Sequence, residues 1–191
     1  MTPSLASKAS DLSLPPPSLR MPADPYDAIA GVEVAHVLTP LTSQQLLDVI
    51  VAGHVECFSE EPSYRRRATA WAMLALEHAG GHAVHGYNLG NIGLGSFTGD
   101  HEPLRAREVL GGHDKMITQQ IRAHDNATTG AADYWDFLAR RFPKALALFD
   151  AGDCAGVARE LKQGRYYTAP EAEYAHAMVG LYADFERRWP E

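Results

Sequence analysis

Residues 68–81 read Ala-Thr-Ala-Trp-Ala-Met-Leu-Ala-Leu-Glu-His-Ala-Gly-Gly, and this stretch decides the fold. From Ala68 to Ala79 only Thr69, Glu77 and His78 are not apolar. A helix that is apolar on nearly all sides lies inside a protein core. The glycine pair at 80–81 is typical of a helix C-terminus, where glycine adopts a backbone conformation that other residues avoid. The sequence therefore predicts a buried central helix that ends at the carboxylate of Glu77.

A second helix and a hairpin flank this central helix along the chain. Apolar side chains at helical spacing precede it, and Thr42 or Ser43 is the predicted N-cap of the helix that carries them. Residues 82–104 are rich in glycine and are predicted to form a loop. Two strand-like runs follow at 105–110 and 115–124, and the turn residues Gly-Gly-His-Asp at 111–114 separate them.

The remainder of the chain is predicted to be helical. Thr128 or Thr129 is the expected cap of the first of these helices, and Asp153 begins a later one. The last helix is expected after Thr168, with an apolar stripe that includes Tyr174 and that we assign to the core. This order predicts an α+β, mainly α, fold in which a small hairpin lobe lies beside a helical body and flanks a substrate cleft.

The composition is that of one domain with a tail. The chain has 191 residues, of which 46% are hydrophobic and 21% are charged, so one sizeable core can form. Residues 1–35 are rich in proline, serine and alanine, and proline favours extended backbone without donating hydrogen bonds. We therefore interpret 1–35 as a tail or linker and 36–191 as the folded domain.

Charge and hydropathy exclude several partners. The formal net charge is −7 and no dense Lys/Arg stripe is present, so nucleic acid is not an expected partner. No run of about 18 apolar residues exists, so no membrane span is expected. The proline run at 15–17 interrupts the N-terminal region, which argues against a secretory signal and leaves the export route open. The two cysteines, Cys57 and Cys154, are expected to be free thiols.

Glu77 is the first candidate for chemistry. An ionised carboxylate in apolar surroundings loses hydration, which raises its pKa and keeps the proton bound at neutral pH. Hydrolysis of a glycosidic bond needs such a general acid at the leaving oxygen. Position alone fits a structural carboxylate that reaches water or pairs with an arginine equally well, because ion-paired carboxylates also have shifted pKa values.

A series of six short motifs begins at Glu77 and continues to residue 170. They are Ala-Leu-Glu at 75–77, Tyr-Asn-Leu-Gly-Asn-Ile-Gly at 87–93, Arg-Glu-Val at 107–109, Ile-Arg-Ala-His-Asp-Asn at 121–126, Ala-Asp-Tyr at 132–134 and Arg-Tyr-Tyr-Thr-Ala-Pro at 165–170. Together they resemble the N-acetylglucosaminidase family of flagellar and autolysin peptidoglycan hydrolases, within the lysozyme superfamily. The resemblance implies a lysozyme-like fold, action on the cell wall, and cofactor-free hydrolysis of β-1,4 bonds between the amino sugars of peptidoglycan.

The resemblance also implies catalytic roles. Glu77 matches the general acid of the family, and Glu108 matches its hairpin carboxylate, which activates water or stabilises the cation-like sugar. A solvated strand carboxylate is an equally good interpretation of Glu108, because charged strand residues usually face water. Asp100, Glu102 and Asp114 compete with Glu108 for the second role.

Four further residues are implied to bind substrate. Tyr166 matches the family tyrosine that lines the cleft near the reactive sugar. Tyr87, Asn88 and Asn91 belong to the loop that shapes the cleft floor, where an asparagine amide can bond both loop backbone and an N-acetyl group. The chain departs from one form of the family pattern at Gly90, where that form has phenylalanine.

Two alternatives stay open. A lysozyme-like domain with a decayed active site can be a non-catalytic glycan-binding or structural module. A zinc-dependent hydrolase that uses His78, His82 and His85 is less favoured, because two glycines separate the first two histidines and no His-Glu-x-x-His motif is present. The bond that is cleaved, its stereochemistry, and delivery through an export or phage-tail partner of the N-terminal tail are left open.

Overall fold

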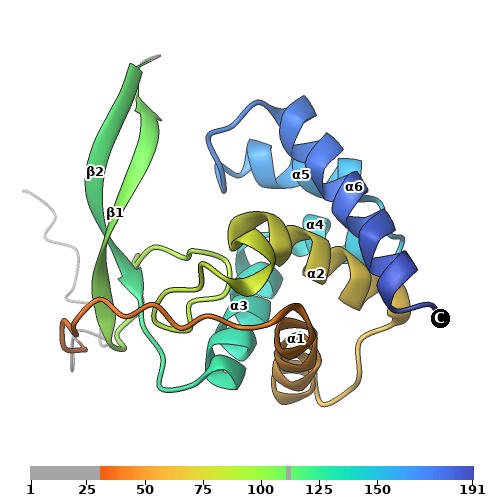
Figure 1. Ribbon diagram of the computed structural model, residues 1–191, viewed down its shortest axis with the longest axis horizontal. Helices are drawn as coiled ribbons and strands as arrows, with labels where there is room; N and C mark the ends of the chain where they lie inside the picture. The colour runs from red at the N-terminus through yellow and green to blue at the C-terminus, as the bar shows by residue number, and fades with distance from the viewer. Residues whose placement is uncertain (1–30, 111–112) are drawn as a thin grey trace, which may run out of the picture.

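The computed structural model describes residues 31–110 and 113–191, and residues 106–110 and 113–115 by their backbone alone. Figure 1 shows a helical body with a two-stranded hairpin standing at one side, which confirms the predicted mainly α architecture. The elements are α1 (Ser43–Phe58), α2 (Tyr64–Glu77), the short 3-10 helix η1 (Ala79–Gly81), β1 (His101–Leu110), β2 (His113–Arg122), α3 (Ala127–Arg141), α4 (Pro143–Phe149), α5 (Cys154–Gln163) and α6 (Glu171–Arg188).

The central helix α2 is buried, as its composition predicts. All residues from Ala68 to Ala75 are buried, and the helix packs against α1, α4 and α6. It ends at Glu77, after which Gly80 and Gly81 turn the chain with φ angles of 73° and 104°. A Cβ at Gly81 would lie 2.5 Å from the carbonyl oxygen of Leu41, so only glycine fits this turn.

The helix caps are partly as predicted. Thr42 caps α1 in a capping box with Gln45, as one of the two predicted residues. The cap of α3 is Asn126, whose Oδ1 accepts from the backbone N–H of Thr129 at 2.9 Å, so the prediction of Thr128 or Thr129 is wrong. Asparagine is a better cap than threonine, and the backbone of Asn126 is extended, as the residue before a helix requires.

The hairpin is longer at its base than the sequence indicates. β1 and β2 pair antiparallel from His101 opposite Arg122 to Leu110 opposite His113, so the predicted loop 82–104 ends earlier than expected. The glycine content of 82–104 favoured a loop, but its last four residues pair with β2. Pro103 is tolerated there because a two-stranded ribbon has free edges that do not need its missing N–H. Of the predicted turn at 111–114, residues 111–112 lie outside the described residues, whereas His113 and Asp114 belong to β2, so that part of the prediction is wrong. β2 also ends at Arg122, two residues before the predicted end.

The N-terminal segment pairs with the base of the hairpin. Residues 31–35 of the predicted tail are described, and they run beside the base of the hairpin (Figure 1). The N–H of Val34 donates to the carbonyl of His101 at 2.8 Å, and the N–H of His101 donates to the carbonyl of Val32 at 3.2 Å. Residues 1–30 lie outside the described part of the chain.

Two smaller observations complete the fold. Cys57 and Cys154 are free thiols, as predicted, and burial raises the pKa of the Cys154 thiol to about 11. Within the described ranges, none of the helices combines the length and the apolar character that crossing a bilayer requires.

Candidate active site

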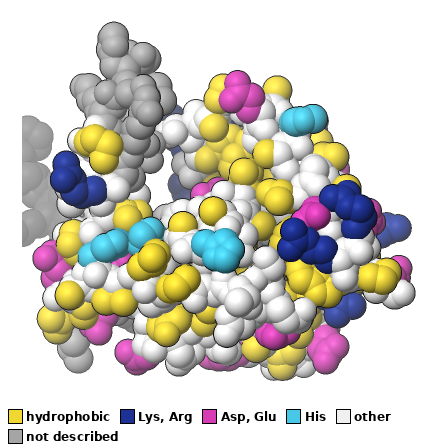
Figure 2. Space-filling model, in the orientation of Figure 1, with side chains coloured by type: hydrophobic (Ala, Val, Ile, Leu, Met, Phe, Trp, Pro, Cys, Tyr) yellow, Lys and Arg dark blue, Asp and Glu magenta, His cyan; other side chains and the backbone are white. Residues whose placement is uncertain are grey.

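A cavity of about 750 Å³ opens between the hairpin side of the molecule and the helical side. Figure 2 shows the surface notched between these two sides. Its walls come from the end of α2, the loop at 90–96, both hairpin strands, the end of α3, the segment at 164–169 and the first turn of α6. Segments that are far apart in sequence therefore meet at one cleft, as the predicted architecture requires.

Glu77 lies on the wall of this cavity. It is the last residue of α2, and its side chain is half-buried. Its carboxylate Oε1 accepts a hydrogen bond of 2.7 Å from the hydroxyl of Tyr174. Its backbone carbonyl accepts a hydrogen bond of 3.3 Å from the side-chain amide of Asn91. The end of α2 is thus held from α6 on one side and from the loop at 87–93 on the other.

Tyr174 is a site residue that the sequence analysis missed. Its ring packs in the core, which confirms that part of the prediction for the α6 stripe. Its hydroxyl, however, reaches Glu77, and its ring stacks on Tyr167 with centroids 3.8 Å apart and planes 7° apart. Both rings line the cavity. The only sequence signal was the position of Tyr174 four residues after the Ala-Pro pair at 169–170.

Buried tyrosine hydroxyls surround Glu77. Burial, and then the charge of Glu77, raise the pKa values of Tyr134, Tyr166 and Tyr174 well above the usual range. These phenols therefore stay protonated at every physiological pH and act as hydrogen-bond donors. Tyr166 donates to the carbonyl of Gly90 at 2.6 Å, so the predicted cleft tyrosine lines the cavity and also ties it together.

The loop at 87–93 combines structural and cavity-lining residues. Asn88 is buried, its Oδ1 accepts from the N–H of Ile92, and its Nδ2 donates to the carbonyls of Ile92 and Arg122. Asn91 lines the cavity, whereas Tyr87 and Asn88 are not among its lining residues. The structure therefore brings Glu77, Asn91 and Tyr166 together and places Asn88 beneath them.

Gly90 explains one departure from the family pattern. Its φ angle is 111°, and a Cβ there would lie 2.9 Å from the ring of Tyr134 and 3.0 Å from the hydroxyl of Tyr166. A side chain at this position would displace both tyrosines. Glycine therefore lets the loop backbone approach the tyrosines and receive the hydrogen bond from Tyr166.

Arg122 is a second wall residue that the sequence analysis did not single out. Its guanidinium pairs with Asp133 at 2.7 Å and lies over the rings of Phe97 and Phe137, at 4.9 and 5.5 Å from their centroids. Burial alone would raise the pKa of Asp133, but hydrogen bonds from His124 and Arg122 hold it below the usual value. This buried pair joins the hairpin base to α3 and holds the Arg122 guanidinium at the cavity wall.

For Glu108, the predicted second carboxylate, the structure describes the backbone but not the side chain. The backbone of Glu108 lies in β1 opposite Lys115, and the side chains of Glu108 and Asp114 fall outside the described residues. The two other competitors lie elsewhere: Asp100 accepts from the N–H of Val32, and Glu102 is buried beside the N-terminal segment. Neither Asp100 nor Glu102 lines the cavity.

The three histidines near Glu77 have separate environments. His78 is buried, and both ring nitrogens face backbone: Nδ1 the carbonyl of Ala83 and Nε2 the N–H of Gly90. Burial lowers the pKa of His78 to about 4. His82 is exposed, and the ring of His85 lies beside that of His36 instead. His78 would have to break both of its backbone contacts to bind a metal.

Several solved structures share this fold. One is a peptidoglycan hydrolase mutant from Sphingomonas sp. A1, with 24% identity, a TM-score of 0.56, and coverage of 73% of this chain and 92% of that chain. The catalytic domain of the autolysin Auto from Listeria monocytogenes has 20% identity and a TM-score of 0.55, with 78% and 88% covered. The glycoside hydrolase domain of FlgJ from Salmonella typhimurium has 18% identity and a TM-score of 0.52, with 78% and 91% covered.

These likenesses confirm the predicted class of fold. The chain has the mainly helical, lysozyme-like fold of those hydrolase domains, with a hairpin beside the helical body. The resemblance predicted from the motifs around Glu77 is thereby confirmed at the level of the fold. No model of a known protein family matches the chain, and no curated protein sequence matches it.

Proposed function

We propose that this protein is a glycoside hydrolase that cleaves β-1,4 bonds between the amino sugars of peptidoglycan, with Glu77 as the general acid. The observation that carries the proposal is the position of Glu77 at the end of a buried helix, on the wall of a cleft of about 750 Å³. The similar structures support it, because they are a peptidoglycan hydrolase, an autolysin domain and a glycoside hydrolase domain.

Two influences prepare Glu77 for proton transfer. As a general acid Glu77 must carry a proton before the reaction, and it is the last residue of α2, where the helix dipole places partial negative charge. Once the proton has moved to the leaving oxygen, the hydrogen bond from Tyr174 stabilises the carboxylate that remains. The same hydrogen bond fixes the orientation of the acid toward the cleft.

The remaining wall residues suit a sugar chain. The aromatic rings of Tyr167, which stacks on Tyr174, and of Phe137 offer flat apolar surfaces. Arg122 and Asn91 offer polar groups beside them. Ligand sites combine apolar lining with a few placed polar groups in this way. We propose that Asn91 and Tyr166 contact the substrate, and that Tyr87 and Asn88 shape the loop that carries Asn91.

We propose Glu108 as the second carboxylate. It belongs to the same strand as Leu104, which lines the cavity. In this role it would activate a water molecule or stabilise the cation-like sugar, and the separation of the two carboxylates would decide between inversion and retention. Action at the cell wall, and a delivery or phage-tail partner of the N-terminal tail, are further parts of the proposal.

The test compares wild type with Glu77→Gln on purified peptidoglycan. The two side chains are nearly isosteric, so we expect the variant to fold and to clear the suspension at least about 100-fold more slowly, the usual loss when a general acid is removed. Glu56→Gln on the exposed face of α1 is the matched control and should clear normally. Equal clearing by Glu77→Gln and wild type would remove Glu77 from the mechanism.

The same assay separates an enzyme from a binding module. A non-catalytic module would sediment with peptidoglycan without clearing it, and Glu77→Gln would sediment equally. Wild-type clearing that depends on Glu77 supports the enzyme. Wild-type binding without any clearing would contradict the proposed hydrolysis.

A further inference from the structure

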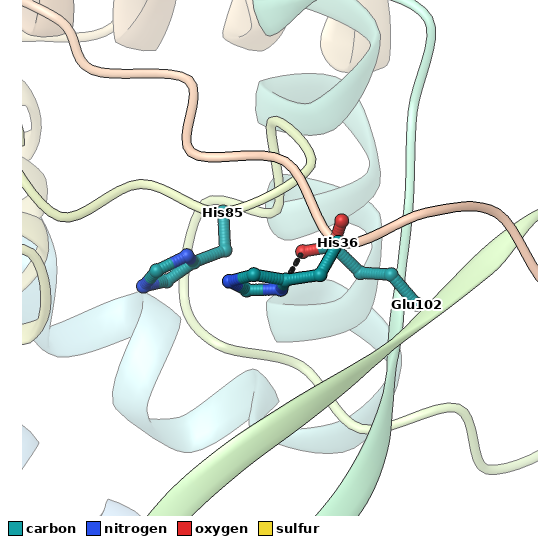
Figure 3. A group of neighbouring side chains, drawn as sticks. All are labelled: His36, His85 and Glu102. Carbon is teal, nitrogen blue, oxygen red and sulfur yellow. Dashed lines mark ion pairs between the residues drawn. The ribbon is translucent and has the colours of Figure 1, made fainter.

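Three potential metal ligands meet on the side of the hairpin base. His36 comes from the N-terminal segment, His85 from the loop after α2, and Glu102 from β1. One ligand atom from each lies within 4.8 Å of the others, and this is the one such group of three among residues 31–110 and 113–191 whose side chains are described. Figure 3 shows the ring of His36 between that of His85 and the Glu102 carboxylate. None of the three residues lines the cleft that holds Glu77.

Buried polar atoms in this cluster lack hydrogen bonds. Glu102 is fully buried; its Oε2 accepts from the N–H of Val37 at 2.9 Å, but its Oε1 receives no hydrogen bond from the described residues. Oε1 lies 3.2 Å from Nδ1 of His36, which is an ion pair when that ring is protonated. Nδ1 of His85 is also buried without a hydrogen bond. A buried carboxylate oxygen and a buried imidazole nitrogen without hydrogen bonds destabilise a fold unless something else binds them.

The local electrostatics favour a cation over two protonated histidines. The rings of His36 and His85 have centroids 4.7 Å apart, so protonating both would place two positive charges side by side. Burial, and then the neighbouring His36, lower the pKa of His85. A neutral imidazole is the form that binds a metal ion, and the buried carboxylate supplies the negative charge that a divalent cation needs.

The donor set and the geometry fit zinc. Two imidazole nitrogens and one carboxylate oxygen are a known ligand set for Zn²⁺, with water in the fourth position. Bonds of about 2.1 Å in a tetrahedral site separate the ligand atoms by roughly 3.4 Å, and Nδ1 of His36 and Oε1 of Glu102 are already 3.2 Å apart. The side chain of His36 is 40% exposed, which leaves a path for the ion and room for the ring to adjust.

Gly86 lets the loop approach the carboxylate. Its φ angle is 51°, and a Cβ there would lie 3.0 Å from the carboxyl carbon of Glu102. Any other residue would push the loop, and with it His85, away from Glu102. The backbone is therefore shaped around this carboxylate.

We propose that His36, His85 and Glu102 bind one Zn²⁺ ion, which clamps the N-terminal segment onto the loop after α2 and onto the hairpin. The three ligands lie far apart in sequence and are brought together only by folding. An ion that binds the native state and not the unfolded chain raises the melting temperature as its concentration increases. The role is structural, and it is independent of the function proposed for the cleft.

The test uses the full chain, freed of metal with a chelator and titrated with zinc chloride. We expect calorimetry to give one Zn²⁺ ion per chain and the melting temperature to rise on binding. His85→Ala and His36→Ala should each weaken the affinity at least tenfold and abolish the thermal shift. His82→Ala, which removes an exposed histidine of the same loop, should bind as wild type does.

Spectroscopy guards against variants that fail to fold and against adventitious metal. Co²⁺ in place of Zn²⁺ should give wild type the intense visible bands of a four-coordinate ion, and His85→Ala should lack them. Circular dichroism in metal-free buffer should show that the histidine variants are folded. Glu102→Gln is not used as a test, because Glu102 also accepts a hydrogen bond from the N–H of Val37 and its replacement can disturb the fold. Zinc binding of equal affinity in wild type and the His36→Ala/His85→Ala double variant would overturn the proposal, as would no stoichiometric binding by wild type.

Discussion

At the scale of single residues, the hydroxyl of Tyr174 connects the chemistry of Glu77 to the packing of α6. The ring is buried in the core, and only the hydroxyl oxygen reaches the carboxylate, at 2.7 Å. In the proposed mechanism this hydrogen bond strengthens when Glu77 loses its proton, because charge-assisted hydrogen bonds are stronger than neutral ones. Tyr174 is thus a positioning residue whose contribution belongs to the reacting state.

Tyr174→Phe tests this role. The variant keeps the ring and its stack on Tyr167 and removes only the hydroxyl. We expect kcat on soluble peptidoglycan fragments to fall about 10- to 100-fold, since a hydrogen bond to a charged group contributes about 1.5–3 kcal/mol, while KM stays near that of wild type. Tyr167→Phe removes a hydroxyl that donates to Ala158 instead, and it should keep the wild-type kcat. An unchanged kcat in Tyr174→Phe would contradict the assignment.

His78 makes stability depend on pH. Its Nε2 accepts from the N–H of Gly90, so only the neutral ring fits the site, and burial lowers its pKa from 6.5 to about 4. Between these two values the unfolded chain binds more protons than the native protein. The native state therefore loses stability as the pH falls from about 6.5 to about 4, by about 3 kcal/mol for this group at 1.36 kcal/mol per pKa unit.

Denaturant unfolding at several pH values checks this effect. In His78→Gln, the slope of unfolding free energy against pH below about 6.5 should be shallower than in wild type. A slope should remain, because burial also lowers the pKa of His54. The exposed control His82→Gln should keep the wild-type slope. Parallel curves for His78→Gln and wild type would show that His78 is not the titrating group.

At the scale of elements, the start of α3 shows where sequence reasoning loses resolution. Asn126, Thr128 and Thr129 can all cap a helix, and the apolar period of α3 does not choose among them. The choice is made by the backbone: Asn126 is extended, with φ of −155°, whereas both threonines already lie within the helix. The base of the hairpin escaped prediction for a similar reason, because the glycine-rich composition of 82–104 favours a loop, whereas His101 pairs with Arg122 of the distant strand β2.

Asn126→Ala should lower the unfolding free energy by about 1 kcal/mol, because it removes the side-chain cap of α3. Thr128→Ala, two residues later and inside the helix, should change it by less than about 0.5 kcal/mol. Urea unfolding of the two variants beside wild type provides the measurement. A larger loss in Thr128→Ala than in Asn126→Ala would restore the threonine as the cap.

At the scale of the whole molecule, the sequence predicted the architecture and the place of Glu77 at the end of a buried helix, but not the residues that contact Glu77 from other elements. The apolar helix that ends at Glu77 needs no distant information, since its period and its glycines are local. Tyr174 is 97 positions away from Glu77, and Arg122 faces Asp133 across the junction of the hairpin and α3. Contacts of this kind arise only when the helical body and the hairpin pack together.

The same packing separates two regions of the molecule. The cleft with Glu77 lies between the hairpin side and the helices, and the histidine cluster joins the N-terminal segment to the hairpin base outside that cleft. Glu102 competed with Glu108 for the catalytic role in the sequence analysis, but it belongs to the histidine cluster instead. One hairpin strand thus carries both the proposed second carboxylate and a proposed metal ligand.

Mass spectrometry of the soluble products from purified peptidoglycan tests the central claim most directly. Wild type should release muropeptides with new reducing ends at N-acetylglucosamine or at N-acetylmuramic acid, and the end that is found also identifies the bond that is cut. Glu77→Gln should release none above the level of untreated wall. Products cleaved only at peptide or amide bonds, or the same glycan fragments from Glu77→Gln at the wild-type rate, would contradict the account.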